Sequence, residues 1–462
     1  MQHCFVVDLN RCTGCGACVI ACTIENSHRK GEGINWREIY TFNEVHHPEL
    51  PLFNFSLSCN HCEIPACLNA CPSGAYSKDK ETGAVIIDPQ LCMGCKYCTW
   101  ACPYDAPRFN PVSGVIEKCD FCNGRLKQND SPACVTACPV GALKIEDIVG
   151  DIPIQRQDGF TNAGLNPSIQ FKPLRSQQNK PESVFFHEPL TNTRLFEASQ
   201  KLPERKITLK SEWTLVFFTS IAFILVALLT ASIVMPFNPN PFLFLFVGII
   251  GTGAGTIHLG HKERSYRAIF NFKKSWLSRE IALFSAFLGL GWLYLMFFKE
   301  YPILGWITVY IGFFSLFAID RIYQVAMKIG VMDFHSAHTV FDGLYLTGCL
   351  TGETALFITV GLLKLFLYLY RKWLFIGVKQ KTHPFLSICR LLTGFFIPQV
   401  IFSIQLGMPA LHNGVDIPWY YLLFIISVTT GELIDRVEFY DELEIITPRR
   451  QILLDMEKRL ND

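Results

Sequence analysis

The stretch Cys92-Met-Gly-Cys95-Lys-Tyr-Cys98-Thr-Trp-Ala-Cys102-Pro103 decides the fold of the first third of the chain. Three cysteines spaced two residues apart, then a fourth after three more and a proline, form the spacing that binds cubane iron–sulfur clusters. A tight loop brings three thiolates to three irons of one cube, and the fourth cysteine points toward the other cluster of a pair. The proline fits the first turn of a helix, where its missing N–H costs nothing. The stretch therefore predicts a domain built from paired clusters.

The same arrangement recurs three more times before residue 140. The group that begins at Cys12 repeats the spacing, the group at Cys59 lengthens one gap, and the group at Cys119 lengthens it further. Sixteen thiolates in four groups of four suit four [4Fe–4S] clusters, arranged as two ferredoxin-like pairs. The predicted metal ligands are Cys12, Cys15, Cys18, Cys22, Cys59, Cys62, Cys67, Cys71, Cys92, Cys95, Cys98, Cys102, Cys119, Cys122, Cys134 and Cys138.

Zinc sites and disulfides are the alternatives for closely spaced cysteines. Zinc needs only two C-x-x-C pairs, whereas Cys12–Cys18 and Cys92–Cys98 each contain a third cysteine at the same spacing. A disulfide framework is typical of secreted chains and does not suit cysteines packed in C-x-x-C units. Iron–sulfur clusters are therefore favoured. Cys4, Cys349 and Cys389 lie in apolar stretches and are expected to be plain buried residues.

Composition divides the 462 residues sharply. Every grouped cysteine precedes residue 140 and nearly all long apolar runs follow residue 210, so more than one domain is expected. The net charge of +1 gives no reason to invoke nucleic acid as a partner. The first residues lack the basic stretch and apolar core of a signal peptide, and they lack a twin-arginine signal. We therefore expect no export signal on this chain.

Residues 1–143 are predicted to form an α+β domain of two ferredoxin-like modules. Short apolar strands, such as Phe5–Asp8 and Val85–Asp88, precede the cysteine loops, and one or two helical turns follow each loop. Little aliphatic sequence is left for a core, so the clusters are expected to hold this domain together. Residues 144–210 are rich in Pro, Asn, Gln and charge. They are a linker or, as we favour because of their length, an extended arm on a partner protein.

The chain from Trp213 onward is predicted to be a bundle of membrane helices. His338–Tyr370 is too long for one span, because its 33 residues would measure about 50 Å as a helix against a hydrocarbon core of ~30 Å. A break near Gly352-Glu353 gives two short spans and keeps the carboxylate out of lipid. We therefore predict an all-α polytopic bundle of about eight transmembrane helices over residues 211–440, with seven as the alternative, and a polar tail over 441–462. The clear spans are Trp213–Met235, Pro241–Gly260, Ile281–Phe298, Pro302–Ile319, Phe385–Leu406 and Trp419–Leu433.

Basic residues support the count of eight. With eight spans, the lysines and arginines of the loops and both ends fall on the side of the cysteine domain, and only Lys299 falls on the other. Seven spans would place the four basic residues of 371–381 on the opposite side. The positive-inside rule then puts the cysteine domain and Asp462 in the cytoplasm, at the inner membrane.

Several stretches resemble subunits of dimethyl sulfoxide reductases. Ser58–Cys67, Cys92–Cys98 and Lys118–Cys122 look like the iron–sulfur subunit, and Asn162–Leu174 resembles the tail of that subunit. His258–Gly260, Ser275–Glu280 and Gly431–Tyr440 look like the membrane anchor subunit. The chain therefore resembles a fusion of two subunits that are usually separate.

The resemblance also implies how the cysteines group around the clusters. Each set of three takes its fourth ligand from another motif, and all sixteen positions keep cysteine, so four [4Fe–4S] clusters are implied. The implied sets are Cys12, Cys15 and Cys18 with Cys138; Cys119, Cys122 and Cys134 with Cys22; Cys59, Cys62 and Cys67 with Cys102; and Cys92, Cys95 and Cys98 with Cys71. In such enzymes a separate chain carries the molybdopterin, and no pterin-binding or substrate-converting sequence is found in this chain.

The expected function is electron transfer from a membrane quinol, expected to be menaquinol, through the clusters to a molybdopterin-containing catalytic subunit. His258 and Glu280 are the predicted catalytic proton acceptors, since histidine titrates near neutral pH and a carboxylate can assist it. The resemblance places the quinol site at His258, Gly260, Arg264 and Glu280. The alternative is that Glu280 caps a helix and His258 only reaches the membrane interface.

Three other functions stay open at this stage. The chain could reduce quinone for an oxidising molybdoenzyme, since cluster potentials span roughly −700 to +450 mV and direction cannot be read from spacing. It could feed an assimilatory reductase such as a nitrate reductase. A transporter with a redox domain is disfavoured because few polar residues are expected within the bundle.

Overall fold

The computed structural model describes residues 2–26, 34–148, 156–161, 163–175, 206–324, 335–377, 383–405, 419–443 and 445–461. The chain forms two compact units. The cluster unit comprises Met1–Lys206, Leu259–Arg267 and Ile445–Asp462, and the helical unit comprises Ile207–His258 and Ala268–Glu444. Three predictions concern residues outside the described ranges. They are the position of Asp462, the end of a span at Leu406 and most of the predicted arm.

A three-stranded sheet forms the base of the cluster unit. Strand β1 (Gln2–Asp8) pairs antiparallel with β8 (Leu143–Ile148) and parallel with β9 (Ile169–Lys172). The strand predicted at Phe5–Asp8 is therefore confirmed. Strand β9 lies within the segment predicted as an arm, so part of that segment completes the sheet of its own domain.

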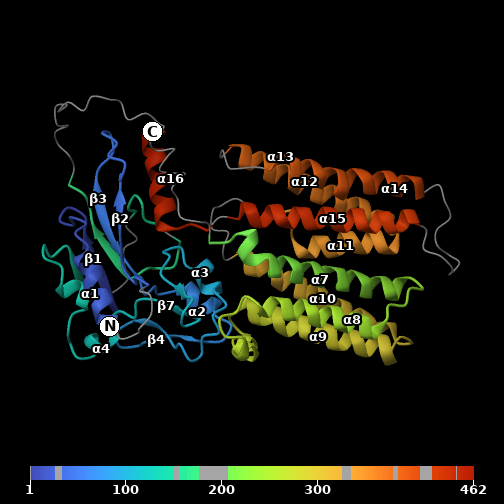
Figure 1. The fold of residues 1–462 in the computed structure, drawn as a ribbon, viewed down its shortest axis with the longest axis horizontal. Coiled ribbons are helices and arrows are strands. Elements are labelled where there is room, and N and C mark those ends of the chain that lie inside the picture. The colour runs from blue at the N-terminus through green and yellow to red at the C-terminus, as the bar shows by residue number, and fades with distance from the viewer. Residues whose placement is uncertain are drawn as a thin grey trace. The chain divides into compact units, whose positions relative to one another are not determined.

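Three hairpins and five short helices surround the cysteine loops (Figure 1). The predicted strand at Val85–Asp88 corresponds to β5. A short helix begins one residue before the third cysteine of each triplet, and another begins directly after Cys122. The hairpin strands are β2 (Glu38–Phe42) with β3 (Phe53–Leu57), β4 (Tyr76–Lys78) with β5 (Val85–Ile87), and β6 (Arg108–Asn110) with β7 (Val115–Glu117). The helices are α1 (Ala17–Asn26), α2 (Ala66–Ala70), α3 (Tyr97–Ala101), α4 (Asn123–Leu126) and α5 (Ala133–Thr136).

The last helix in the sequence is part of the cluster unit. Helix α16 (Pro448–Asn461) contributes Ile452 and Met456 to an apolar core of the cluster unit, which also contains Phe5 and Phe55. Polar contacts fix the same helix, as Gly159 donates its N–H to Asp455 at 2.7 Å. The residues that the sequence suggested as a polar tail therefore form an amphipathic helix with a buried face, and Figure 1 shows α16 alongside the β2–β3 hairpin.

Long helices make up the helical unit. The predicted break near Gly352 is confirmed, because α11 ends there and the glycine adopts a left-handed φ of 69° before α12 begins. Among the described residues, five helices are long and apolar enough to cross a membrane, and α8 is a shorter apolar helix. The chain is therefore a membrane protein, and the count of eight spans stays a prediction. The helices are α7 (Leu209–Val234), α8 (Pro241–Thr256), α9 (Trp276–Phe297), α10 (Pro302–Gln324), α11 (Thr339–Thr351), α12 (Thr354–Gly377), α13 (Pro384–Leu391), α14 (Ile397–Gln405) and α15 (Trp419–Glu442), with a 3-10 segment η1 (Lys262–Ile269) and a π-helical turn η2 (Leu392–Phe396).

Candidate cluster sites and a buried charge network

The structure gathers the sixteen cysteines into four sets of four. We call them the first site (Cys12, Cys15, Cys18 and Cys138), the second (Cys22, Cys119, Cys122 and Cys134), the third (Cys59, Cys62, Cys67 and Cys102) and the fourth (Cys71, Cys92, Cys95 and Cys98). The thiols of the first site line one partly open pocket, and those of the third site line another. In the second and fourth sites the thiols lie within electrostatic range of one another.

The four sites follow one another through the unit. Arg37 lies within electrostatic range of thiols from the first and second sites, and Cys119 of the second lies near Cys59 of the third. Tyr76 is close to thiols of both the third and fourth sites. The order is therefore first, second, third, fourth. Cys15 is exposed, which makes the first site the one nearest to solvent.

Local backbone conformation shapes the cysteine loops. Gly14 and Gly94 sit between cysteines with φ of 72° and 70°, values that residues with a Cβ adopt only at a cost. The turns that follow aim backbone N–H groups at sulfur, as Ala75 donates to Cys71 Sγ at 3.4 Å and Ala142 to Cys138 Sγ at 3.2 Å. Such donors stabilise the negative charge of a cluster and help to set its potential.

Arg37 is a buried cation beside the first two sites. Its side chain is 1% exposed, its guanidinium lies 4.5 Å from the centre of the Phe5 ring, and it donates to Ser56 Oγ at 2.9 Å and Ser58 Oγ at 2.8 Å. Ser56 in turn lies 3.2 Å from Cys18 Sγ. The Nε of Arg37 has no hydrogen-bond partner within the described part of the chain. Burial opposes the charge of Arg37, but the nearby cysteine sulfurs, once ionised, favour it and keep its pKa above the ordinary value.

Lys118 is a second buried cation, between the second and third sites. It donates to the carbonyls of Val85 and Cys119, the latter at 2.7 Å, and it is 2% exposed. Burial, with Lys118 and Arg37 nearby, holds the pKa of His61 well below its ordinary value. His61 therefore stays neutral, and its Nδ1 accepts a hydrogen bond from the Val85 N–H at 2.9 Å.

These surroundings fit iron–sulfur clusters. No three histidine, cysteine or carboxylate side chains in the described ranges converge closely enough for a single metal ion. At the first and third sites the four thiols instead line an open pocket, as the ligands of a cubane would. Burial raises the pKa of the Cys22 thiol to about 12 against the opposing charge of Arg37, so its thiolate needs a metal to form at neutral pH. The residues that would hold the clusters are the sixteen predicted cysteines.

The four predicted quinol residues fall in different units. His258 lies half-buried in the turn after α8, and Glu280 lies in α9 with 5% of its surface exposed; both belong to the helical unit. Gly260 and Arg264 belong to the cluster unit. Arg264 donates to the carbonyls of Pro89 and Cys92, each at 2.8 Å, so its side chain holds the loop of the fourth site.

Three glycines allow the segment Leu259–Arg267 to lie against that loop. Gly260 donates its N–H to the Gly94 carbonyl at 3.4 Å, and His261 donates its N–H to the Met93 carbonyl at 3.1 Å. A Cβ on Gly260 would overlap the Gly114 carbonyl oxygen, and a Cβ on Gly94 would overlap the same atom. Only glycine at these positions permits so close an approach of the two backbones.

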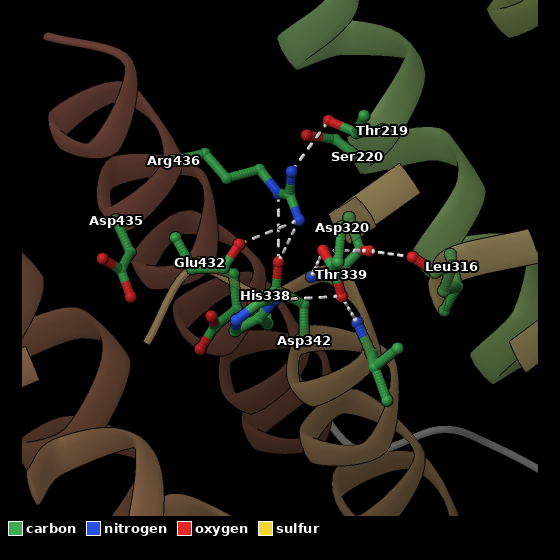
Figure 2. Close-up of polar contacts among 12 residues, drawn as sticks. Thr219, Ser220, Leu316, Asp320, His338, Thr339, Asp342, Glu432, Asp435 and Arg436 are labelled. Atoms are coloured by element: carbon green, nitrogen blue, oxygen red, sulfur yellow. Dashed lines mark hydrogen bonds and ion pairs between the residues drawn. The ribbon is translucent and has the colours of Figure 1, made fainter. Parts of the chain in front are cut away.

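A network of fully buried charges fills part of the helical unit, and the sequence did not predict it. Lys364 of α12 pairs with Asp342 of α11 at 2.7 Å and with Glu432 of α15 at 2.8 Å. Figure 2 shows Arg436 of α15 reaching to Asp342, at 2.6 Å, and to Thr219 of α7, at 3.0 Å. The network therefore ties four helices together.

The same network continues along α15. Asp435 pairs with Arg371 at 2.7 Å and with Arg390 at 3.4 Å, and Arg390 also contacts Glu432 at 3.1 Å. The helical unit therefore buries many charged side chains, and the expectation that few polar residues lie at mid-membrane stays a prediction. Glu432, Asp435 and Arg436 are spaced so that they lie on one side of a helix. This spacing was the only feature of the sequence that pointed to a charge network.

Comparisons with known proteins agree with the two units. Residues 5–24 match a family model described as a 4Fe-4S binding domain, and residues 51–148 match a 4Fe-4S dicluster domain. Residues 208–405 match the DMSO reductase anchor subunit (DmsC).

Individual relatives cover the iron–sulfur part. An anaerobic dimethyl sulfoxide reductase chain of Escherichia coli is 44% identical over 191 residues, which are 37% of this sequence and 89% of that protein. The probable anaerobic dimethyl sulfoxide reductase chain YnfG of the same organism is 40% identical over 174 residues, covering 36% and 82%. A sulfite dehydrogenase subunit of Allochromatium vinosum is 36% identical over 201 residues, covering 38% and 84%.

Proposed function

Because this protein belongs to the dimethyl sulfoxide reductase family, as an iron–sulfur electron-transfer subunit fused to the membrane anchor subunit, we propose that it oxidises membrane quinol and delivers the electrons to a separate catalytic subunit. The family membership implies a catalytic partner, and we propose that this partner carries molybdopterin. The observation that carries the proposal is the unbroken order of four thiol sites, whose first member reaches the surface.

The electron path is proposed to begin at the fourth site and end at the first. Each site would hold one [4Fe–4S] cluster, which carries one electron at a time. The backbone N–H groups and the buried cations Arg37 and Lys118 favour the added negative charge. The segment that follows His258 in the sequence is fixed on the Cys92 loop, which supports the fourth site as the entry point.

The protons of the quinol need acceptors near its oxygens. A quinol loses two electrons and two protons, and we propose that His258 takes one proton and Glu280 the other. Glu280 is 5% exposed and forms no ion pair in the described part of the chain, and we propose that its carboxyl group exchanges protons with the quinol. Gly260 and Arg264 would position the fourth site rather than contact the quinol, since both are held by the loop that carries Cys92.

The test compares two routes of cluster reduction in the complete complex. Glu280→Gln and His258→Phe should each slow reduction by menaquinol by roughly 10²–10⁴-fold, the usual effect of a positioned base. Reduction by dithionite, which needs no quinol site, should be unchanged, and about sixteen irons per chain should be found. Normal quinol oxidation in both variants would overturn the assignment of the two residues.

Two further features are part of the proposal. The basic loops support a cytoplasmic position for the cluster unit, which a reporter fused after Asp462 can test. The likeness to a sulfite dehydrogenase subunit favours, as a second candidate, the opposite direction, in which an oxidising partner reduces quinone. The test compares two rates, the reduction of added quinone by the reduced clusters and the reduction of the oxidised clusters by quinol. A faster reduction of quinone would support the second candidate.

A further inference from the structure

The four cysteine loops share one backbone turn but carry different side chains at its first position. The residue before the second cysteine of each loop has a left-handed φ, which ranges from 42° at His61 to 72° at Gly14. The residue one position earlier therefore has the same place in every loop. In the order of the first, second, third and fourth sites, these residues are Thr13, Asp120, Asn60 and Met93.

The side chain of Asn60 is buried without a hydrogen-bond partner. Asn60 is 2% exposed, and neither its amide nitrogen nor its amide oxygen finds a partner in the ranges that the structure describes. Asp120, at the corresponding position, instead turns back onto its own loop, where its Oδ1 accepts the N–H of Cys122 at 2.8 Å. A buried amide that stays unpaired is costly, so the Asn60 side chain calls for an acceptor from outside the polypeptide.

Asn60 borders the pocket of the third site together with the four thiols of that site. Apart from the cysteines, Asn60 and Tyr104, the described residues that line this pocket have apolar side chains. A cluster held by these thiols would present sulfur atoms, which accept hydrogen bonds and whose N–H donors help to set the reduction potential. The side-chain amide of Asn60 is therefore a donor suited to this pocket.

Hydrogen bonds from a distant segment fix the loop that carries Asn60. Ser168 donates its N–H to the Asn60 carbonyl at 2.7 Å and its hydroxyl to the His61 carbonyl at 3.0 Å. The His61 ring accepts the Val85 N–H at 2.9 Å and stacks on the Phe121 ring, with the ring centres 4.3 Å apart. A left-handed φ is unfavourable for histidine, and these contacts hold the loop in that conformation. Asn60 thus lies on a fixed backbone, as precise placement of a donor requires.

We infer that the Nδ2–H of Asn60 donates a hydrogen bond to a sulfur atom of the cluster in the third site and raises the reduction potential of that cluster. The inference rests on the proposed function, because that function places a cluster in this site. Reduction adds negative charge beside the amide, and a positioned N–H donor stabilises this charge. A higher potential at the third site favours the proposed step in which an electron leaves the fourth site.

The test replaces Asn60 in the complete complex with its catalytic partner. Asn60→Leu removes the N–H donor and nearly keeps the shape of the side chain. A redox titration followed by electron paramagnetic resonance should show one cluster whose equilibrium constant for reduction falls about three- to tenfold, or about 28 to 59 mV for one electron. The potentials of the other three clusters serve as internal references and should not move.

Two more measurements tie the shift to the hydrogen bond. Asn60→Thr keeps an O–H donor, as Thr13 does in the first loop, and should keep most of the native potential. In protein with isotopically labelled asparagine side-chain nitrogen, the resonance of the affected cluster should show a nitrogen coupling that Asn60→Leu lacks. Asn110→Leu is the matched control, because Asn110 is also buried but donates to Glu117 at 3.0 Å, and it should leave the potential of the third site unchanged.

The outcomes separate the inference from the proposed function. Unchanged potentials in Asn60→Leu with about sixteen irons bound would overturn the inference alone and would mean that a buried water satisfies the amide. A parallel shift of all four potentials, or an equal shift in Asn110→Leu, would also overturn it, because altered packing would then be the cause. If the native protein holds only about twelve irons and lacks the third cluster, the proposed function and the inference fail together.

Discussion

Buried cations are treated differently in the two units. In the helical unit Lys364, Arg390 and Arg436 all contact buried carboxylates at between 2.6 and 3.4 Å. In the cluster unit Arg37 and Lys118 form no ion pair with a carboxylate in the described ranges, and their partners are hydroxyl groups and backbone carbonyls. Burying a charge without a counter-charge is costly, so an anion must complete the second arrangement.

This difference between the buried cations indicates which unit needs a counter-charge from a bound group. The charges of the network in the helical unit neutralise one another and need no counter-charge from outside. The two cations of the cluster unit face thiols that become negative only when metal binds. Cluster binding is therefore expected to complete the electrostatics of one unit and to leave those of the other untouched. Three experiments test this contrast.

The largest effect is expected at Lys364, in the self-neutralised network. Lys364→Met leaves Asp342 and Glu432 buried with one cation fewer, which should cost about 3–5 kcal/mol of unfolding free energy. Unfolding of the purified protein in detergent, followed by the loss of helical signal, measures this cost. The exposed Lys299, changed to Met in the same way, serves as the control and should have no effect.

A second variant identifies the cause. Adding Glu432→Gln to Lys364→Met should recover part of the lost stability, because it removes one uncompensated carboxylate. A loss below about 1 kcal/mol for the single variant would mean that the network is no more than a set of weak pairs.

The sequence was informative where chemistry depends on local spacing. The cysteine triplets and the break at Gly352 follow from residues next to one another in the chain, so both could be predicted. The partners of Arg37 and Lys364 lie on other strands or helices, and no local pattern announces them. The charged residues at the end of α15 have the sequence pattern of a helix end exposed to water. Their counter-charges lie on other helices, so the sequence of α15 alone does not show that they are buried.

A substitution at Gly260 tests whether the segment Leu259–Arg267 belongs with the cluster unit. Its sequence belongs with the anchor, yet its backbone contacts Gly94 in the loop of the fourth site. Gly260→Ala would force the segment Leu259–Arg267 away from that loop, at a cost of about 1–3 kcal/mol for an overpacked contact. Hydrogen exchange should rise at the backbone amides of residues 260 and 261, which donate to the Gly94 and Met93 carbonyls. Quinol-driven reduction should fall while dithionite reduction is kept.

Gly255→Ala is the control for that change, because a Cβ at this position in α8 would meet no atom within 4 Å. Full quinol activity together with normal exchange protection in Gly260→Ala would show that the three-glycine contact does not hold the loop. If Gly260→Ala loses quinol oxidation but keeps normal hydrogen-exchange protection, Gly260 would instead be a residue of the quinol site.

The smallest effect, and the most direct test of the contrast, is expected at Arg37. Arg37→Gln keeps hydrogen-bonding groups and removes the charge beside the first two sites. Reduction adds negative charge to a cluster, so removal of this cation should lower the reduction potential of those clusters by at least a tenfold change in the equilibrium constant, about 59 mV for one electron. A redox titration followed by electron paramagnetic resonance measures each cluster separately.

Three comparisons make the Arg37 measurement decisive. The fourth site should keep its potential and acts as an internal reference, and Arg37→Lys should keep most of the effect of the native residue. Lys127→Met is the external control, because this cation is half-exposed and paired with Asp79 at 2.7 Å, where water screens its charge. Equal shifts in Arg37→Gln and Lys127→Met, or no shift in either, would show that Arg37 stabilises the fold alone and that the contrast between the two units has no bearing on electron transfer.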